Sequence, residues 1–189
     1  ILSGIKETLE QEKPIRSMEF TKEEMAVVAQ YMFLTMKPLI YVANLGEDEI
    51  KAPENNPHFV KVKEYADKEG CKVVPICAQI ESELAGLDDE DKAMFMEDLG
   101  IEESGLDKLI HEAYRLLGLK TFFTVGADEV RAWTFKDGMT APEMAGIIHT
   151  DFQRGFIRAE TYSYDDLMVY KTELATREAG KVRQEGKAY

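Results

Sequence analysis

The sequence has 189 residues, 44% of them hydrophobic, which is enough to bury one sizeable core or two small ones and excludes an intrinsically disordered chain. Its 23 basic and 36 acidic residues give a net charge of −13, which disfavours capture of nucleic acid by overall electrostatic attraction. A signal peptide and an apolar run of about 18 residues are both absent, so we expect a cytoplasmic protein that does not bind membranes. Because the sequence begins at Ile1 without an initiator Met, we also expect it to be part of a longer protein.

Two helices are predicted at the start of the chain. Residues 1–13 have the polar pattern of the end of a helix, and Pro14 breaks that pattern. Thr21 and Glu24 then have the spacing of a capping box, in which each side chain bonds the other residue's backbone N–H. We expect this second helix to cover residues 22–37.

The next three elements predict a parallel α/β unit. Apolar strands are expected over residues 39–43 and 71–78, with a helix over 57–70 between them. In open parallel sheets, ligands bind beyond the carboxyl ends of the strands. The loops after Ala43 and Ala78 are therefore expected to lie side by side at a binding edge.

The loop after the first strand has the sequence Asn44-Leu45-Gly46-Glu47, which brings an amide and a carboxylate to a glycine turn. Two interpretations stay open. The turn residues favour a simple exit from the strand. The expected place of the loop at the edge of a parallel sheet favours, to the same degree, a loop whose polar groups bind a ligand.

An acidic segment over residues 82–103 is expected to be helical. Its carboxylates are scattered along the segment, so a solvated helix face is favoured over a metal site, and Glu81 and Glu83 are also expected to be solvated. Ser104 is then placed to cap an amphipathic helix that ends at Gly118.

The composition changes near residue 119. Residues 120–189 contain 10 Lys and Arg against 11 Asp and Glu, which leaves 13 and 25 for residues 1–119. Two strands over 120–136, joined by a turn at residues 126–128, predict a β-hairpin, and Thr140 begins a further helix. This pattern favours a separate, small α+β domain.

Five segments of the chain resemble the Obg-like ATPases, the YchF family. They are "PLIYVANLGE" at 38–47, "KVVPICAQIESELAGL" at 72–87, "GLDKLIHEAYRLLGLKTFFTVG" at 105–126, "EVRAWTFKDGMTAPEMAGIIHTDFQRGFIRAE" at 129–160 and "REAGKVRQEGKAY" at 177–189. The resemblance implies an α/β fold: the C-terminal part of a P-loop GTPase-like parallel α/β domain, followed by a small ubiquitin-like β-grasp (TGS) domain. It divides the chain into the end of a helical arm and a return helix (1–37), the C-terminal part of a nucleotide-binding G domain (38–119) and a TGS domain whose final strands are missing (120–189).

The resemblance also implies how a nucleotide base would be read. GTP-binding domains carry Asn-Lys-x-Asp after the corresponding strand, and that Asp accepts two hydrogen bonds from guanine. Glu47 stands in its place, and leaving guanine donors unpaired would cost about 1–3 kcal/mol each, so adenine is favoured. Asn44 would bond the imidazole side of the base, and Leu45 would contact its ring. The implied base-binding residues are Asn44, Leu45, Gly46, Glu47, Cys77, Ala78 and Gln79.

A phosphate-binding loop is not found in the sequence. The pattern G-x-x-x-x-G-K-[ST] is absent, because Val182 follows Gly180-Lys181 and Ala188 follows Gly186-Lys187. The resemblance places this loop, the Mg²⁺ ligands and the residue that positions the attacking water before Ile1. We therefore expect ATP with Mg²⁺ in the intact protein, and neither a metal site, a catalytic residue nor hydrolysis in this chain alone.

The TGS resemblance implies binding to RNA or the ribosome, without recognition of a DNA sequence. Candidate contacts are Arg131, Lys136, His149, Arg154, Arg158, Lys181, Arg183 and Lys187, with Trp133, Phe135 and Phe152 as possible stacking groups. For Trp133 and Phe135, alternation into a core is the favoured interpretation. For His149, capping of a carbonyl at a helix end is favoured over an RNA contact.

Two functional hypotheses follow. The first is an ATPase that acts on the ribosome, to which this chain contributes the base-reading loops and the TGS domain. The alternative is a non-catalytic module that binds RNA or the ribosome. A metabolic enzyme with its own site is disfavoured, because no nucleophile–base pair or carboxylate–His cluster emerges from the sequence.

Overall fold

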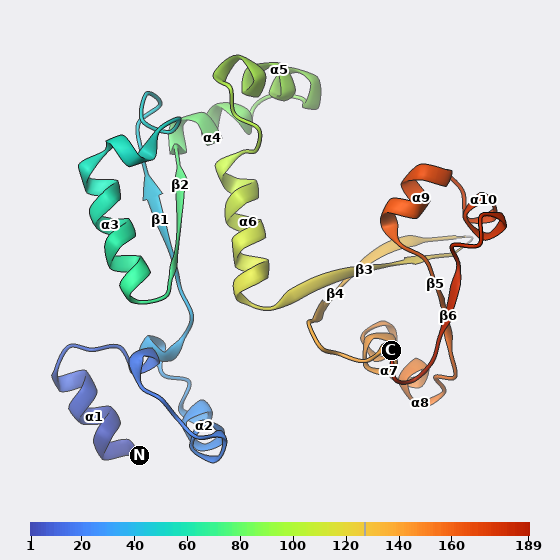
Figure 1. Ribbon diagram of the computed structural model, residues 1–189, viewed down its shortest axis with the longest axis horizontal. Coiled ribbons are helices and arrows are strands. Elements are labelled where there is room, and N and C mark those ends of the chain that lie inside the picture. Colours follow the sequence, from blue (N-terminus) through green and yellow to red (C-terminus); the bar gives the residue numbers. More distant parts are fainter. Residues whose placement is uncertain (127) are drawn as a thin grey trace. The chain divides into compact units, whose positions relative to one another are not determined.

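The computed structural model describes residues 1–126 and 128–189, which form two compact units (Figure 1). Unit 1 is Ile1–Leu117 and unit 2 is Gly118–Tyr189. The α-helices and strands of unit 1 are α1 (Leu2–Glu10), α2 (Lys22–Val28), β1 (Ile40–Asn44), α3 (Pro57–Lys68), β2 (Lys72–Ile76), α4 (Ala78–Leu84), α5 (Asp89–Leu99) and α6 (Gly105–Leu116). Its 3₁₀ turns are η1 (Ile15–Ser17), η2 (Ala29–Tyr31), η3 (Leu34–Met36) and η4 (Pro53–Asn55).

Unit 2 begins with a β-hairpin and continues with short helices and strands (Figure 1). Its elements are β3 (Leu119–Val125), β4 (Val130–Lys136), α7 (Ala141–Ile148), α8 (Thr150–Arg154), β5 (Ala159–Thr161), α9 (Tyr164–Tyr170), α10 (Glu173–Glu178) and β6 (Arg183–Glu185).

The β1–β2 pair is parallel, as the strand–helix–strand pattern predicts. Its register runs from Ile40 opposite Lys72 to Asn44 opposite Ile76, so both strands end at the same edge. Helices α3 and α6 flank the pair on either side (Figure 1). Helix α3 begins where predicted, because the Asn56 side-chain oxygen accepts hydrogen bonds from two backbone N–H groups of its first turn.

The helix predicted over residues 22–37 is wrong in its second half. The capping box of Thr21 forms and starts α2, but the helix ends at Val28 and the chain continues in the turns η2 and η3. Met32 between these turns has a left-handed backbone (φ 48°), which no α-helix accommodates. The reversal brings Phe33 and Met36 against a buried cluster formed by Ile5, Ile15 and Val28.

The predicted boundaries of the second strand and of the acidic helix also shift. Strand β2 stops at Ile76, and Ala78 already begins α4. The acidic segment 82–103 is helical in two parts, the end of α4 and the whole of α5, because Asp88 caps the start of α5 by accepting bonds from two backbone N–H groups. Helix α5 ends at Gly100, whose φ of 66° closes it in the left-handed region.

Unit 2 contains two antiparallel strand pairs. Strands β3 and β4 form the predicted hairpin, from Leu119 opposite Lys136 to Val125 opposite Val130, and β5 pairs with β6. The predicted turn includes Ala127, which lies outside the described residues. The parallel pair of unit 1 and the antiparallel pairs of unit 2 confirm the mixed α/β fold class.

Candidate functional site

The loops that follow β1 and β2 lie side by side at the carboxyl ends of the two strands. The Ala78 N–H donates a hydrogen bond to Asn44 Oδ1 at 3.0 Å, and the Leu45 N–H donates to the Ile76 carbonyl at 2.8 Å. These two bonds connect the loop 44–47 to the start of α4. The expected juxtaposition of the two loops is therefore present.

The Asn44 side chain faces the second loop with its oxygen. A side-chain amide has one acceptor oxygen and an NH₂ group with two donors, and only the oxygen can accept the Ala78 N–H. Asn44 is exposed, and its Nδ2 donates no hydrogen bond within residues 1–126 and 128–189. The loop thus offers an oriented donor at the strand edge.

The seven predicted base-site residues divide into anchors and exposed groups. Leu45 is 9% exposed and Cys77 is 4% exposed, and Cys77 packs with Ile80 and Leu84 in a buried cluster. These two side chains therefore hold the loops to the core. The exposed members are Asn44, Gly46, Glu47, Ala78 and Gln79.

The carboxylate that shapes the first loop is Glu49, which the sequence analysis missed. Its Oε2 accepts the Gly46 N–H at 3.1 Å, and its Oε1 accepts Asn56 Nδ2 at 2.7 Å. Glu47 is exposed and makes no side-chain hydrogen bond or ion pair in the described part of the chain. A Gly followed three residues later by Glu was the available signal, because a carboxylate at that spacing can turn back to the glycine N–H.

The prediction that Glu81 is solvated is wrong. Glu81 is half-buried, and its two carboxylate oxygens accept the N–H groups of Gly105 at 2.7 Å and Leu106 at 3.2 Å. These are first-turn donors of α6, which have no acceptor within their own helix. Ser104 completes this helix start, because its Oγ accepts the Asp107 N–H at 3.0 Å.

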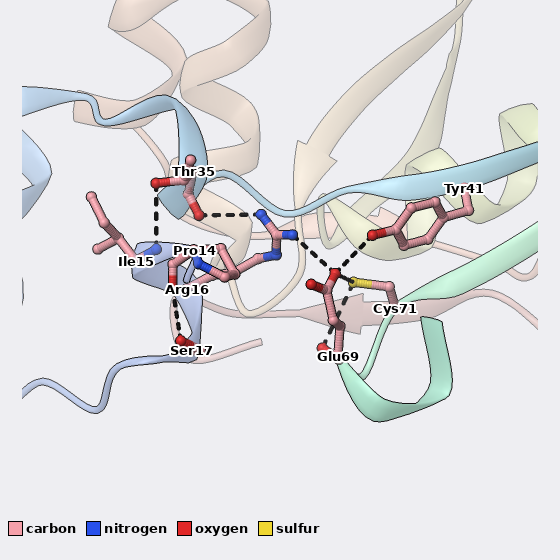
Figure 2. A network of polar contacts seen from close by, with 8 residues as sticks. All are labelled: Pro14, Ile15, Arg16, Ser17, Thr35, Tyr41, Glu69 and Cys71. Atoms are coloured by element: carbon pink, nitrogen blue, oxygen red, sulfur yellow. Dashed lines mark hydrogen bonds and ion pairs between the residues drawn. The ribbon is translucent and has the colours of Figure 1, made fainter. Parts of the chain in front are cut away.

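At the other end of β1 and β2, a polar network connects residues 14–35 to the strands (Figure 2). Glu69 Oε2 accepts hydrogen bonds from Arg16 Nη2 at 2.9 Å and from the Tyr41 hydroxyl at 2.8 Å. Arg16 Nη1 also donates to the Thr35 carbonyl at 3.3 Å. The network lies near the first residues of the strands, so it does not belong to the edge that carries Asn44.

The same network shifts the pKa values of its acids. Hydrogen bonds from Arg16 and Tyr41 hold the pKa of the Glu69 carboxyl below its usual value, because they stabilise the carboxylate. The hydrogen bond to Glu69, with burial, raises the pKa of Tyr41 to about 12. Glu69 therefore remains charged in the folded state as the pH falls toward its usual pKa.

The cationic side chains of unit 2 fall into two groups. Three of the predicted contacts already lie near acids: Arg131 with Glu129 at 4.0 Å, Lys181 with Asp166 at 3.6 Å and Arg183 with Glu185 at 3.1 Å. Arg131 also lies over the Trp133 ring, 4.2 Å from its centre. The other predicted cations are exposed and form no ion pair within the described part of unit 2; they are Lys136, Arg154, Arg158 and Lys187.

The three predicted stacking residues differ in exposure. Trp133 is half-buried, and its Nε1–H donates to Thr124 Oγ1 at 2.9 Å. Phe135 is half-buried and packs edge-on against Phe122, with 5.8 Å between ring centres. Phe152 is 56% exposed. The favoured interpretation of Trp133 and Phe135 as packing residues agrees with these contacts, whereas Phe152 presents its ring to solvent.

Phe152 borders a surface hollow of about 620 Å³. Ile157, which is 78% exposed, and Arg158 line the same hollow, together with Ala145, Asp151, Gly155 and Phe156. The hollow thus combines exposed apolar groups with a guanidinium.

His149 caps a helix, but at the opposite end from the one predicted. It lies between α7 and α8, and its Nδ1 accepts the Asp151 N–H at 3.2 Å. The prediction of a capped carbonyl is therefore wrong. Helix α8 begins directly after His149, and the Asp151 N–H in its first turn has no acceptor within the helix, so it donates to His149.

Residues 1–126 and 128–189 contain neither a metal-binding cluster nor a membrane-spanning helix. No group of three or more His, Cys, Asp or Glu side chains there could hold a metal ion. No helix in these ranges has the length and apolar composition required to cross a bilayer.

Comparison with known proteins relates both units to one family. The family model YchF-GTPase_C, described as a protein of unknown function (DUF933), matches residues 119–189. The "Ribosome-binding ATPase YchF" of Bacillus subtilis (strain 168) is 58% identical over 189 residues, covering 100% of this chain and 52% of the relative. The protein of the same name from Escherichia coli O157:H7 is 50% identical over 181 residues, 96% of this chain and 49% of that relative.

A solved structure agrees with these matches. The structure of the Schizosaccharomyces pombe YchF GTPase superimposes with a TM-score of 0.82 at 35% identity, covering 99% of this chain and 50% of that chain. The chain spans about half the length of the curated relatives that it matches. High identity over the whole chain and a shared fold lead to one conclusion: the chain belongs to the YchF family.

Proposed function

We propose that unit 1 supplies the base-reading edge of an ATP-hydrolysing protein. The observation that carries this proposal is the hydrogen bond between Asn44 Oδ1 and the Ala78 N–H, which orients the Asn44 NH₂ group as a donor beyond the ends of β1 and β2. Adenine presents a ring-nitrogen acceptor to such a donor. In this proposal Gly46, Glu47 and Gln79 line the base, with Leu45 and Cys77 as the anchors of the two loops.

The residue at position 47 supports adenine over guanine. A carboxylate reads guanine when it accepts two N–H groups at once, and Glu47 has a longer side chain than the Asp that would do so. Guanine would then bury donors without partners, at about 1–3 kcal/mol each. Adenine has no such donors to satisfy.

The relatives differ in the nucleotide that their names imply, because the curated proteins are named ATPases and the solved structure is named a GTPase. In our proposal, the phosphate-binding loop and the Mg²⁺ ligands lie in the part of the relatives that this chain does not cover. Hydrolysis therefore belongs to the full-length protein, and this chain alone is inactive.

Calorimetric titration of the full-length protein with ATP and GTP, each with Mg²⁺, tests the proposal. We expect tighter binding of ATP. Equal affinities for the two nucleotides would contradict the proposed reading of the base.

We further propose that unit 2 contacts ribosomal RNA in the cytoplasm. Arg154 and Arg158 support this proposal, because they are exposed without an ion-pair partner in the described part of unit 2. The exposed ring of Phe152 lines the same hollow as Arg158, where a base can stack. The curated relatives are named ribosome-binding, which agrees with this assignment.

Co-sedimentation of the full-length protein with ribosomes at two salt concentrations tests this second proposal. Binding through phosphate contacts weakens steeply as salt rises, because cations on RNA are displaced when the protein binds. Binding that does not respond to salt would contradict phosphate contacts and would favour a protein surface of the ribosome.

A further inference from the structure

The first turn of α6 lies unusually close to β2 and α4. A Cβ atom at Gly105 would lie 2.8 Å from Ile76 Cγ2 and 2.9 Å from Glu81 Oε1, so only glycine fits there without displacement. Ile76 is the residue opposite Asn44 in the β1–β2 register. The start of α6 therefore packs directly behind the strand end that carries the candidate base site.

Glu81 connects this helix start to the second loop. It lies on α4, one turn after Ala78, and its own N–H donates to the Cys77 carbonyl at 3.0 Å. Its carboxylate accepts two N–H groups of α6, and the positive end of that helix adds to the attraction. Helix α4 has seven residues, so a bond made by Glu81 also fixes the position of Ala78.

We propose that Glu81 is a positioning residue for recognition of the nucleotide base. By holding α4 against α6, it places the Ala78 N–H where this group orients the Asn44 amide. Glu81 contacts no nucleotide in this proposal and acts only through Ala78 and Asn44. The inference rests on the proposed base site.

Removing the Glu81 charge should weaken binding of a nucleotide that carries a base and should not weaken binding of one that lacks it. Gln at position 81 can accept only one of the two N–H groups, and its own NH₂ faces the other. The Glu81→Gln variant of the full-length protein should bind ATP about 3- to 10-fold more weakly, the range for loss of one hydrogen bond. Ribose 5-triphosphate, which has no base, should bind the variant and the unchanged protein equally.

Glu83→Gln is the matched control. Glu83 lies on the same helix, is exposed and makes no side-chain hydrogen bond in the described ranges, so its substitution removes the same charge without removing a contact. The control should bind ATP as the unchanged protein does. A second measurement needs no nucleotide: in ¹⁵N-resolved NMR spectra, the Ala78 amide should shift and exchange faster in Glu81→Gln, but not in Glu83→Gln.

The outcomes separate this inference from the proposed function. If the unchanged protein binds ATP no better than ribose 5-triphosphate, the base site itself is wrong and the role of Glu81 falls with it. If ATP is preferred but Glu81→Gln equals Glu83→Gln in ATP affinity, only the positioning role is wrong. Equal weakening of ATP and ribose 5-triphosphate binding would also overturn it, because that result indicates a general structural defect.

Discussion

The two candidate surfaces differ in how their polar side chains are held. At the carboxyl ends of β1 and β2, Asn44, Glu49 and Glu81 each bond backbone N–H groups of neighbouring segments. On unit 2, Arg154 and Arg158 extend from the surface without an ion-pair partner in the described ranges. A surface held by the backbone is suited to reading one small molecule precisely, whereas extended cations are suited to a large, charged partner that tolerates variation in geometry.

The first prediction concerns Asn44 at the carboxyl ends of β1 and β2. Asn44→Ala removes both the acceptor of the Ala78 N–H and the proposed base donor, and should weaken ATP binding by about 1.5–3 kcal/mol. Asn44→Asp keeps the acceptor, loses the donor and adds a negative charge that repels the acceptor nitrogen of the base. Titration of both variants of the full-length protein with ATP distinguishes the roles: we expect weakening in both, and near-normal binding by Asn44→Asp would reduce Asn44 to a loop contact.

The second prediction concerns Glu47 and the preference for adenine over guanine. Glu47→Asp shortens the side chain to the length that pairs with guanine, and should narrow or reverse the preference for ATP over GTP by about 1–2 kcal/mol. Competition between the two nucleotides measures this change. Asp48→Glu is a matched control, because it also changes side-chain length by one methylene at constant charge, and Asp48 is exposed and makes no side-chain bond in the part of the chain that the structure describes. A GTP affinity that stays constant in Glu47→Asp would contradict a role for position 47.

The sequence predicted the parts of these surfaces that depend on strand order, and it did not predict the parts that depend on hydrogen bonds to the backbone. The strand–helix–strand pattern placed Asn44 and Ala78 together correctly, because parallel strands must end at one edge. The role of Glu49 was missed although its spacing from Gly46 was a signal, and the role of Glu81 was missed because its partner, the Gly105 N–H, lies 24 residues away in the sequence. The end of α2 at Val28 was missed for a related reason: the segment after it reverses to reach a buried cluster assembled from residues distant in sequence.

The third prediction tests the surface of unit 2. Replacing both Arg154 and Arg158 by Ala should weaken ribosome binding about tenfold and lower the salt dependence by about two phosphate contacts. Replacing Lys181 and Arg183 by Ala is the matched control, because these cations already pair with acids. Co-sedimentation at several salt concentrations measures both pairs. Equal losses in the two double variants would show that free and paired cations do not differ in function.

The fourth prediction compares an enclosed ion pair of unit 1 with an exposed pair of unit 2. Glu69 and Glu160 both have lowered pKa values, through Arg16 and Arg177 respectively. A carboxyl whose pKa is lower in the folded state stabilises the fold above its unfolded pKa, here about 4.5, and this contribution is lost as the pH falls through the folded value. The stabilisation is therefore complete at pH 7.

We expect Glu69→Gln to lower the thermal midpoint at pH 7 and the difference from the unchanged protein to shrink below pH 4.5. Glu160→Gln should have a smaller effect, because its pair is about half exposed and solvent screens it. Circular dichroism melts across pH measure both, with Glu64→Gln as an exposed control on α3. A larger effect at pH 3 than at pH 7 would contradict the assigned sign.

The last prediction concerns Trp133, which is the single Trp of the chain. Trp133→Phe keeps one aromatic ring but loses the second ring of the indole and the Nε1–H bond to Thr124, so it should cost about 1–2 kcal/mol of stability. The ring is half-buried next to Arg131, so we interpret Trp133 as a packing residue. We therefore expect the folded variant to bind ribosomes as the unchanged protein does. Chemical unfolding followed by circular dichroism measures the first quantity, and co-sedimentation with ribosomes measures the second. Loss of ribosome binding without loss of stability would contradict the packing role of Trp133. It would instead indicate that Trp133 contacts RNA and that Trp133 and the exposed Phe152 both stack on bases.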